Sequence, residues 1–434
     1  MENSNGKKIK KVAMFSIHSD PLAPLGSQEC GGQNIYVRYL AEELEKFGCS
    51  VDIFTRWDSG HKKQIATLGK RSRVIRLKGG PVSYIPKSEL FEVLPEIFNN
   101  FLVFSDFKNS YDIFHGHYWD GGWMAIEANK KFNKPFVENF HSLGKIRMDT
   151  KEKYKTNGKE GDYFIKRFEL EKEIIKKSSV IISLSETEKK NLKDFYNCPL
   201  EKVAVIPGGV NLRHWPLIEK IKAREKVCSN NESKFIILFV GRLEWRKGIG
   251  TLIAAGNLLK EEIPNLKILI VGGKIFGKIT NKADIKEYNR LSEIIKNNKI
   301  ENIVSFRGSI DHNQLPIFYR ASDVFVVPSY YEPFGLVALE GMANKIPVIA
   351  SRVDGLMTII KSGENGLLFE PRNALDLKEK VLSIYKSKEL SKKLTENAYN
   401  DISLNYSWNL IVKKINSIYN NILEKNENSS SSSI

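Results

Sequence analysis

The chain begins the same kind of structural unit twice. Two short apolar runs, KKVAMFSI (Lys10–Ile17) and KFIILFVG (Lys234–Gly241), each lead into a polar, glycine-containing loop and then into a helical pattern. This pattern is typical of a buried strand followed by a helix. The 434 residues suffice for two or three cores of ordinary size. We therefore expect at least two α/β domains rather than a single small module.

Strand-like and helical segments alternate through both halves. The strand-like segments are SVDIFTR, RVIRL, YDIFHGH, PFVENFH, SVIISLS and KVAVIPGG in the first half, and LKILIVGG, IVSFRGS, SDVFVVPS and IPVIASRV in the second. Helical stretches such as NIYVRYLAEELEKFG lie between them. This order is typical of Rossmann-like domains, in which helices flank a mostly parallel sheet. Two such domains would leave a cleft at the carboxyl ends of their strands, where open α/β sheets bind ligands.

Changes in composition indicate the domain boundaries. The stretch Pro207–Ser233 interrupts the strand pattern with Gly, Pro, Asn and Ser, so we place the crossing between domains there. We assign residues 1–213 to an N-terminal domain and residues 214–408 to a C-terminal domain. Residues 409–426 are expected to form a helix that packs back on the N-terminal domain. The low-complexity tail, residues 427–434, is expected to be disordered.

The chain is basic, with 67 Lys and Arg against 51 Asp and Glu, a net charge of +16. Such a charge favours anionic partners, although a Lys-rich composition can also simply keep a surface soluble. The four cysteines lie far apart without metal-ligand spacing, so we expect buried thiols in a reducing compartment. No signal-peptide core and no apolar run of about 20 residues is present. We expect a cytoplasmic protein.

Several motifs resemble other classes of site. GGKIFGKI has the P-loop spacing but carries Ile279 where a Mg²⁺-binding Ser or Thr would stand. His115, His117 and His141 could be imagined as zinc ligands, but no carboxylate partner or helical H-x-x-x-H spacing supports a metal. No G-x-G-x-x-G follows either first strand and no G-x-S-x-G occurs, which argues against a dehydrogenase and a serine hydrolase. We predict no metal site.

The segment VPSYYEPFGLVALEGMA (Val327–Ala343) gives the strongest indication of a ligand site. A strand is expected to end near Ser329, and a helix to begin at Pro333, because the first helical turn tolerates the missing N–H of proline. The backbone N–H groups that follow would then face an anion or sugar hydroxyls. They belong to Phe334, Gly335 and Leu336.

Charged residues surround this segment. Glu332 is expected at the start of the helix and Glu340, eight positions later, about two turns into it, unless both are surface acids beside an amphipathic helix. Arg242 and Lys247 follow the strand Lys234–Gly241, which is expected to begin the second domain, and they could neutralise a diphosphate. In the first half, two glycines precede a helix and would let a ligand approach the backbone. A nucleotide diphosphate that carries a polyhydroxylated group fits all of these features.

The motifs GGQNIYV, HGHYWDGG, FHSLGK, VIPGGVN, VGRLEWRKG and YEPFGLVALEGMA occur in this order, with the two glutamates at this spacing. In these motifs the chain resembles the retaining nucleotide-sugar glycosyltransferases of the GT-B fold, glycosyltransferase group 1, from Val12 to about Trp408. It is most similar to the sucrose-phosphate and mannosylfructose-phosphate synthases, and to the inositol-phosphate glycosyltransferases of mycothiol synthesis. The resemblance implies an α/β fold of two Rossmann-like domains, an N-terminal one for the acceptor and a C-terminal one for the donor.

The resemblance also implies roles for individual residues. Arg242 and Lys247 would bind the donor diphosphate, and Glu340 the donor ribose. Glu332 would hold the hydroxyls of the transferred sugar. The expected donor-binding residues are Gly32, Arg242, Lys247, Glu332, Phe334, Gly335, Leu336 and Glu340. The expected catalytic residues are Arg242, Lys247, Glu332 and His141, and His141 would lie beside the reacting sugar unless it only caps the following turn.

The acceptor-binding residues are expected among Gly31, Gln33, Asn34, Arg56, Lys145 and Arg147. The three cations fit a phosphorylated acceptor, although Lys145 and Arg147 could instead be solvated loop charges. Gln33 matches the sucrose-phosphate type and Asn34 the inositol-phosphate type. HSLGK and YIPK favour a fructose phosphate, and HSDPLAPLG favours an inositol phosphate, so the acceptor stays open.

The resemblance predicts that a hexose is transferred, with retention of configuration, to a phosphorylated sugar or polyol. UDP-glucose is the preferred candidate for the donor. The alternatives are transfer of N-acetylglucosamine to an inositol phosphate, GDP-mannose-dependent mannosyl transfer, and a phosphorylase with lysine-bound pyridoxal phosphate. A non-enzymatic basic protein that binds nucleic acid or a membrane surface is a further alternative. We expect the nucleotide sugar as co-substrate, no cofactor, no nucleic acid and no stable membrane insertion. A homodimer is left open.

Overall fold

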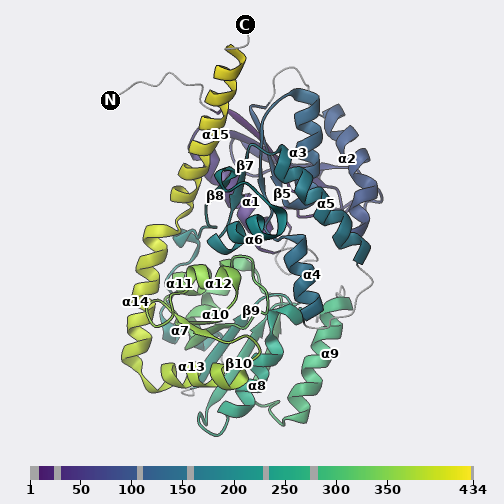
Figure 1. Ribbon diagram of the computed structural model, residues 1–434. Coiled ribbons are helices and arrows are strands. Elements are labelled where there is room, and N and C mark those ends of the chain that lie inside the picture. The colour runs from purple at the N-terminus through teal and green to yellow at the C-terminus, as the bar shows by residue number, and fades with distance from the viewer. Residues whose placement is uncertain are drawn as a thin grey trace, which may run out of the picture. The chain divides into compact units, whose positions relative to one another are not determined.

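Figure 1 shows the computed structural model of the chain. The structure describes residues 9–23, 31–104, 111–153, 161–227, 234–273 and 282–431. These residues form two compact units. Unit 1 contains the described residues up to Pro207 together with the segment that begins at Trp408, and unit 2 contains Gly208–Ser407. Each unit is built around one sheet.

The sheet of unit 1 has eight strands in the order β3-β4-β2-β1-β5-β6-β7-β8. All neighbouring strands are parallel except β3 and β4, which pair antiparallel. The strands are β1 Lys11–Phe15, β2 Ser50–Arg56, β3 Ile65–Thr67, β4 Ser72–Leu77, β5 Ile113–His117, β6 Phe136–Asn139, β7 Val180–Ser183 and β8 Val203–Val205. The central β1 is buried on both faces beyond its first residue, which explains its unbroken apolar sequence.

Helices cover the sheet of unit 1 on both faces. They are α1 Gly32–Lys46, α2 Leu90–Phe104, α3 Tyr118–Phe132, α4 Gly144–Lys153, α5 Gly161–Lys177, α6 Glu186–Tyr196 and α15 Trp408–Ser431, with short 3-10 helices at Lys87–Glu89 and Leu200–Lys202. Phe15 on β1 packs against the rings of Phe54, Phe101 and Phe114, with centroids 5.1 to 5.8 Å away. These rings join strands β1, β2 and β5 to helix α2 in one apolar core.

Helix α15 packs on α1 in unit 1, as the yellow helix of Figure 1 shows. Trp408 at its start contacts the rings of Tyr36 and Tyr39 on α1. The helix is longer than the segment 409–426 predicted from the sequence, so part of the tail 427–434 that was expected to be disordered is helical. Asn and Ser are weak helix formers, but the tail has no Pro or Gly to end a helix that already has packed turns. Residues 432–434 lie outside the described residues.

The sheet of unit 2 has six parallel strands in the order β11-β10-β9-β12-β13-β14. The strands are β9 Phe235–Val240, β10 Leu266–Val271, β11 Val304–Gly308, β12 Val324–Val327, β13 Val348–Ser351 and β14 Leu367–Phe369. The helices are α7 Lys220–Val227, α8 Ile249–Leu259, α9 Lys282–Asn297, α10 Leu315–Ala321, α11 Leu336–Ala343, α12 Asp354–Ile359, α13 Ala374–Lys386 and α14 Lys388–Asn405, with 3-10 helices at Leu212–His214, Trp245–Lys247 and His312–Gln314. Apolar side chains of β9, β10 and β12 form its core.

The division between the units follows Pro207, whereas the boundary predicted from the sequence lies after residue 213. Val210 pairs with Ser407, and its N–H donates to the carbonyl of Tyr406, which attaches the residues after Pro207 to unit 2. The stretch expected to be only a crossing also contains α7, which packs on α10.

The predicted α/β class with two mostly parallel sheets is confirmed. None of the described helices is long and apolar enough to cross a membrane. Cys49 and Cys198 are buried free thiols, while Cys30 and Cys228 lie outside the described residues. The P-loop-like segment lies outside them from residue 274 onward.

Candidate active site

In unit 2 the loop after β9 carries three basic residues and one acid. Glu244 pairs with Arg242 at 2.8 Å and with Arg246 at 2.7 Å, so one carboxylate bridges the two guanidinium groups. The loop then forms the 3-10 helix Trp245–Lys247 and turns into α8 at Gly248, whose φ is +68°. A Cβ at Gly248 would lie 1.8 Å from the carbonyl oxygen of Pro328, so only glycine lets the loop approach β12 this closely.

Lys247 and Glu332 form the ion pair at the centre of this region. Lys247 Nζ lies 2.5 Å from Glu332 Oε2, which also accepts a hydrogen bond from Ser329 Oγ at 3.2 Å. Burial alone would raise the pKa of the Glu332 carboxyl, but Lys247 and Arg246 lower it below its ordinary value. Burial lowers the pKa of the Lys247 ammonium, and the Glu332 carboxylate opposes that shift. The sequence prediction places both residues in the site, and the structure brings them into contact.

The loop between β12 and α11 is fixed through its backbone. Tyr330 N–H donates to Arg246 O at 2.7 Å, and Gly355 N–H donates to Glu332 O at 3.1 Å. The expected helix start at Pro333 is wrong: α11 begins at Leu336, because Gly335 before it has a φ of +99° and breaks the helical path. The amide N–H groups of Phe334, Gly335 and Leu336 have no hydrogen-bond partner among the described residues. Their predicted contact with a ligand stays a prediction.

Glu340 lies just over one turn into α11 rather than two turns, because the helix begins later than expected. Its side chain is buried, and Tyr319 Oη donates to Glu340 Oε2 at 3.1 Å. His312 Nε2 lies 3.7 Å from the other carboxylate oxygen. Trp215 packs edge-on against both His312 and Tyr319. Glu340 is thus held in one orientation by aromatic neighbours, and its contact with a donor ribose stays a prediction.

In unit 1, His141 follows β6 on a strained turn. Its φ is +55°, and Ser142 N–H donates to Phe140 O at 2.6 Å across it. A three-residue turn with positive φ at a non-glycine residue is rare and is found where the surrounding structure imposes it. In the register of β5 and β6, His117 lies opposite Asn139, and His117 Nδ1 contacts His141 Nε2 at 3.0 Å.

A buried ion pair on α5 holds the loop that follows His141. Arg167 Nε donates to Glu171 Oε1 at 2.7 Å, and its guanidinium also donates to the carbonyl of Ser142. The Glu171 carboxylate accepts from the N–H of Gly144 at 3.0 Å. Both side chains are fully buried, and the Glu171 carboxylate raises the pKa of the guanidinium although burial opposes this. Sequence reasoning missed this pair, because its partners come from a loop more than twenty residues away.

Cationic side chains lie close to the ring of Tyr118, at the start of α3. Lys87 Nζ lies 5.1 Å from the centroid of its ring and the Arg167 guanidinium 4.3 Å. Burial would raise the pKa of the phenol, but Arg167, Lys87 and Arg147 together lower it below its ordinary value. Arg147, predicted from the sequence, thus acts on this phenol through its charge, and its contact with an acceptor stays a prediction. Tyr118 and Lys87 were not singled out, although both lie in the quoted segments HGHYWDGG and YIPK.

Lys145 lies beside this cluster in sequence, at the start of α4. Its Nζ pairs with Asp149 at 2.8 Å, one helical turn later, and both side chains are about one third exposed. This contact fits the alternative of a solvated charge as well as an acceptor contact, so its role stays a prediction.

The first turn of α1 has the expected glycines at its start. Gly31 is the N-cap and Gly32 the first helical residue, and Gly32 is exposed. Gln33 Nε2 donates to Ser16 Oγ at 3.2 Å and approaches the carbonyl oxygen of His117 at 3.5 Å. Gly31, Gly32 and Gln33 thus lie at the carboxyl ends of β1 and β5, close to the histidines. Their contacts with donor or acceptor remain predictions.

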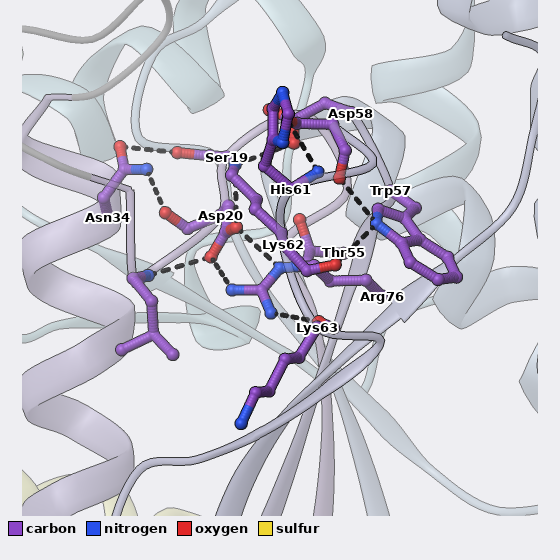
Figure 2. Close-up of polar contacts among 12 residues, drawn as sticks. Ser19, Asp20, Asn34, Thr55, Trp57, Asp58, His61, Lys62, Lys63 and Arg76 are labelled. Atoms are coloured by element: carbon purple, nitrogen blue, oxygen red, sulfur yellow. Dashed lines mark hydrogen bonds and ion pairs between the residues drawn. The ribbon is translucent and has the colours of Figure 1, made fainter. Parts of the chain in front are cut away.

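Asn34 is structural rather than available to an acceptor. Its side chain is buried, and Oδ1 accepts from Gly31 N–H at 2.8 Å and Ser19 Oγ at 2.7 Å, while Nδ2 donates to Asp20 O at 2.7 Å. Figure 2 shows the bonds of Asn34 to Ser19 and Asp20 beside the Asp20 carboxylate, which Arg76 contacts at 2.9 Å and Lys62 at 3.0 Å. The sequence predicts the start of this helix, but it does not reveal that residues of the loop after β1 bind the side chain of Asn34.

Arg56 is also structural. Its side chain is 4% exposed, and its guanidinium donates to the carbonyl oxygens of Gly79, Pro81 and Ser83. The expected role as an acceptor ligand at a strand end is therefore wrong, because these three carbonyls use the guanidinium to fix the loop after β4.

The described residues contain no group of three or more His, Cys, Asp and Glu side chains that could hold a metal ion. Both ring nitrogens of His115 are used within unit 1, by Tyr419 at 2.6 Å and Asn139 at 3.0 Å. His115 is thus not a metal ligand, and metal-independent chemistry stays a prediction.

Two protein-family models match the chain. Residues 30–214 match Glycosyltransferase Family 4, and residues 220–401 match Glycosyl transferases group 1. The two matches follow the division between unit 1 and unit 2.

Curated relatives align along most of the chain. The D-inositol 3-phosphate glycosyltransferase of Pseudarthrobacter chlorophenolicus is 29% identical over 382 residues, which cover 87% of each chain. The mannosylfructose-phosphate synthase of Agrobacterium fabrum is 28% identical over 421 residues, 95% of this chain and 91% of that protein. Among solved structures, the sucrose-phosphate synthase of Thermosynechococcus elongatus has a TM-score of 0.85 and 33% identity, and the match covers 95% of this chain and 99% of that one.

Proposed function

The chain belongs to the group 1 glycosyltransferases of the GT-B fold, and on that premise we propose that it transfers a hexose from a nucleotide diphosphate sugar to a phosphorylated sugar or polyol. The first candidates are UDP-glucose as donor and fructose 6-phosphate as acceptor, with retention of configuration at the anomeric carbon. The relatives named for inositol 3-phosphate and mannosylfructose-phosphate keep inositol phosphate as acceptor and mannose as transferred sugar among the alternatives, the latter with GDP-mannose as its candidate donor.

The donor is proposed to bind in unit 2. Departure of the nucleoside diphosphate develops negative charge on its phosphates, and Arg242 and Lys247 would stabilise that charge. The unpartnered N–H groups at the start of α11 add donors for phosphate or sugar oxygens. Glu332 would accept from sugar hydroxyls while it stays paired with Lys247. Glu340, held by Tyr319, would accept from the ribose hydroxyls.

The cations around Tyr118 are the observation that carries the choice of a phosphorylated acceptor. Lys87 and Arg147 act on the same phenol as the buried Arg167, so positive charge accumulates at one place in unit 1. Arg167 is paired with Glu171, so Lys87 and Arg147 are the cations of this group that we propose for the acceptor. An acceptor phosphate matches such a group of cations better than a neutral sugar does. We propose that Lys87, Arg147 and Lys145 attract it.

The chemical balance of the proposed transfer is simple. The acceptor hydroxyl forms the new glycosidic bond on the face from which the diphosphate leaves, so configuration is retained. The leaving phosphate accepts the hydroxyl proton, and the bond between the anomeric carbon and the phosphate oxygen breaks. No side-chain nucleophile is required, and charge stabilisation by the protein would supply most of the rate enhancement.

A matrix of donors and acceptors tests the proposal. UDP-glucose, UDP-N-acetylglucosamine, GDP-mannose and ADP-glucose would each be incubated with fructose 6-phosphate, inositol 3-phosphate and the two unphosphorylated acceptors, with and without EDTA. We expect one donor to give product with one phosphorylated acceptor, unchanged by EDTA, and NMR of the product to show the donor's anomeric configuration. Equal transfer to the unphosphorylated acceptor would contradict the acceptor assignment. No transfer with any pair would contradict the proposed substrates.

A further inference from the structure

Three histidines form a stack inside unit 1. The ring of His115 lies 4.1 Å from that of His117 at an angle of 30°, and the ring of His117 lies 5.2 Å from that of His141 at 29°. His115 and His117 are fully buried, and His141 is 9% exposed. Burial lowers the pKa of all three rings, to about 3 for His115 and His141, so the stack is neutral near pH 7.

The inner ring, His115, has a defined tautomer. The amide Nδ2 of Asn139 donates to the carbonyl of Ile182 at 2.5 Å, which turns Oδ1 toward His115 Nε2 at 3.0 Å. An amide oxygen can only accept, so His115 carries its proton on Nε2. Tyr419 of α15, 2.6 Å from Nδ1, must then donate its hydroxyl proton to that nitrogen. This end of the stack is satisfied on both nitrogens.

The middle ring, His117, has one polar contact through its side chain. Its Nδ1 lies 3.0 Å from His141 Nε2, and its Nε2 is buried without a partner among the described residues. Two neutral rings can share one proton in two ways. If His141 donated, His117 would carry its own proton on Nε2 as an orphaned buried N–H. If His117 donates, its Nε2 keeps only an unsatisfied lone pair. In proteins, buried N–H donors without a partner are rarer than buried acceptors without one, so the second arrangement is favoured.

We propose that His117 is a positioning residue that donates from Nδ1 to His141 and so fixes His141 as the tautomer with its proton on Nδ1. The Nδ1 of His141 has no partner among the described residues, and His141 is the exposed end of the stack. That end therefore presents a hydrogen-bond donor. A sugar oxygen or phosphate oxygen beside it would be bound, whereas a group that can only donate would not.

The strained turn explains why a positioning residue is needed. The turn at His141 fixes the backbone, with Ser142 N–H bonded to Phe140 O, but it leaves the ring free to rotate about its side-chain torsions. The bond from His117 and the edge of Tyr36, 5.0 Å away, fix the ring. The inference rests on the proposed function in one respect, the expectation that His141 lies beside the transferred sugar.

The tautomer can be measured without substrate. Long-range ¹H–¹⁵N correlation of the unliganded protein, with ¹⁵N in its seven histidines, distinguishes protonated from unprotonated ring nitrogens. We expect His117 and His141 both to be protonated on Nδ1, and His115 on Nε2. His141 protonated mainly on Nε2 would overturn the proposal, whatever the enzyme's activity.

Two substitutions of His117 separate positioning from packing. In His117→Asn an amide nitrogen occupies nearly the place of Nδ1, whereas His117→Leu fills the volume without a donor. We expect the Leu variant to lower kcat roughly 10- to 100-fold, as the loss of an orienting partner does elsewhere. The Asn variant should recover most of kcat, with the His141 tautomer of the wild type. An equal loss of kcat in both variants would contradict the proposal. If the Leu variant does not fold, kcat of the Asn variant and the NMR spectrum still test whether His117 positions His141.

Tyr419→Phe is the matched control. It removes a hydrogen bond from the same stack, but at the end remote from His141. We expect a lower Tm, an unchanged His141 tautomer and an unchanged kcat. If Tyr419→Phe lowered kcat as much as His117→Leu does, weakening the stack at any position would be enough to reduce kcat. That result would contradict a specific positioning role for His117. Wild-type protein without transferase activity, but with the expected tautomers, would contradict the proposed function and leave this inference standing.

Discussion

The ammonium of Lys247 lies 2.5 Å from the carboxylate of Glu332, and both side chains are 12% exposed. The two residues come from different loops of unit 2, one after β9 and the other after β12. Each is therefore the counter-ion that keeps the other charged in a place with little water. In the proposed function, the lysine that would neutralise a departing diphosphate is thus kept charged by the carboxylate that would also bind the transferred sugar.

Lys247→Met removes one charge of this pair. We expect kcat to fall by about 100- to 1,000-fold, because one electrostatic stabiliser of the leaving group is lost. The free energy of unfolding should fall by about 3 kcal/mol, because the Glu332 carboxylate remains buried without its partner. Steady-state kinetics and urea unfolding measure the two effects.

The double variant Lys247→Met with Glu332→Gln separates these effects. Its stability should return toward that of the wild type, because no unpaired charge remains, while its activity stays low. Recovery of activity together with stability would show that Lys247 only supports the fold.

Arg56→Met tests the correction to its predicted role. We expect the free energy of unfolding to fall by about 2 kcal/mol, because three carbonyl oxygens lose their charged donor. In the folded fraction of Arg56→Met, KM for the acceptor should not change. Lys145→Met is the contrasting variant, for which stability should hold and KM for the phosphorylated acceptor should rise. A raised KM in Arg56→Met at unchanged stability would restore the original prediction.

Lys87→Gln tests the cation cluster. Loss of one charged contact to phosphate should raise KM for the phosphorylated acceptor by about tenfold. KM for the donor should stay the same. The pKa of Tyr118 should also rise, because Lys87 is one of the cations that lower it, and phenolate absorbance can follow that change. Lys131→Gln, an exposed charge at the end of α3, is the control and should leave all three values unchanged.

Glu138 makes the stability of unit 1 depend on pH. Its carboxyl is fully buried, has no hydrogen-bond partner among the described residues, and faces Asp120, Glu171 and Glu188. Burial and these three acids raise its pKa well above the ordinary value. Its contribution to stability is therefore complete below the pKa of the unfolded chain, and is lost as pH rises through the higher pKa of the folded state.

Glu138→Gln cannot ionise, so its stability relative to the wild type should rise with pH. Urea unfolding between pH 4 and pH 8 should show no advantage at the acidic end and a growing one toward pH 8. Glu188, whose pKa burial raises to about 7, should act in the same direction. A difference between variant and wild type that is the same at every pH would refute a buried, protonated Glu138.

The sequence predicted the sheets better than the helix starts. The runs at Lys10–Ile17 and Lys234–Gly241 became β1 and β9, because strands buried on both faces are continuously apolar and are recognised without their neighbours. The short strands β3 and β14 were not among the segments predicted as strands. The start of α11 was placed at Pro333, but the conformation of Gly335 decided it, and a glycine's φ cannot be deduced from its identity.

The candidate site was predicted in part. The contact between Lys247 and Glu332 joins two residues that the sequence had already assigned to one ligand. Arg56 and Asn34 were misjudged, because the groups that bind them come from loops whose course depends on tertiary packing. The bond between His117 and His141 depends on the pairing of β5 with β6, which the order of strands along the chain does not specify.

The composition of unit 1 has a consequence for how the protein is made. Trp408 and Tyr419 complete the contacts of α1 and His115, yet a ribosome delivers them only after all of Gly208–Ser407. Domains usually fold in the order in which they are synthesised. Here the later unit can finish first, while the earlier one still exposes the surface that α15 will cover. The nascent histidine stack therefore acquires the hydrogen bond from Tyr419 only after all of unit 2 has been synthesised.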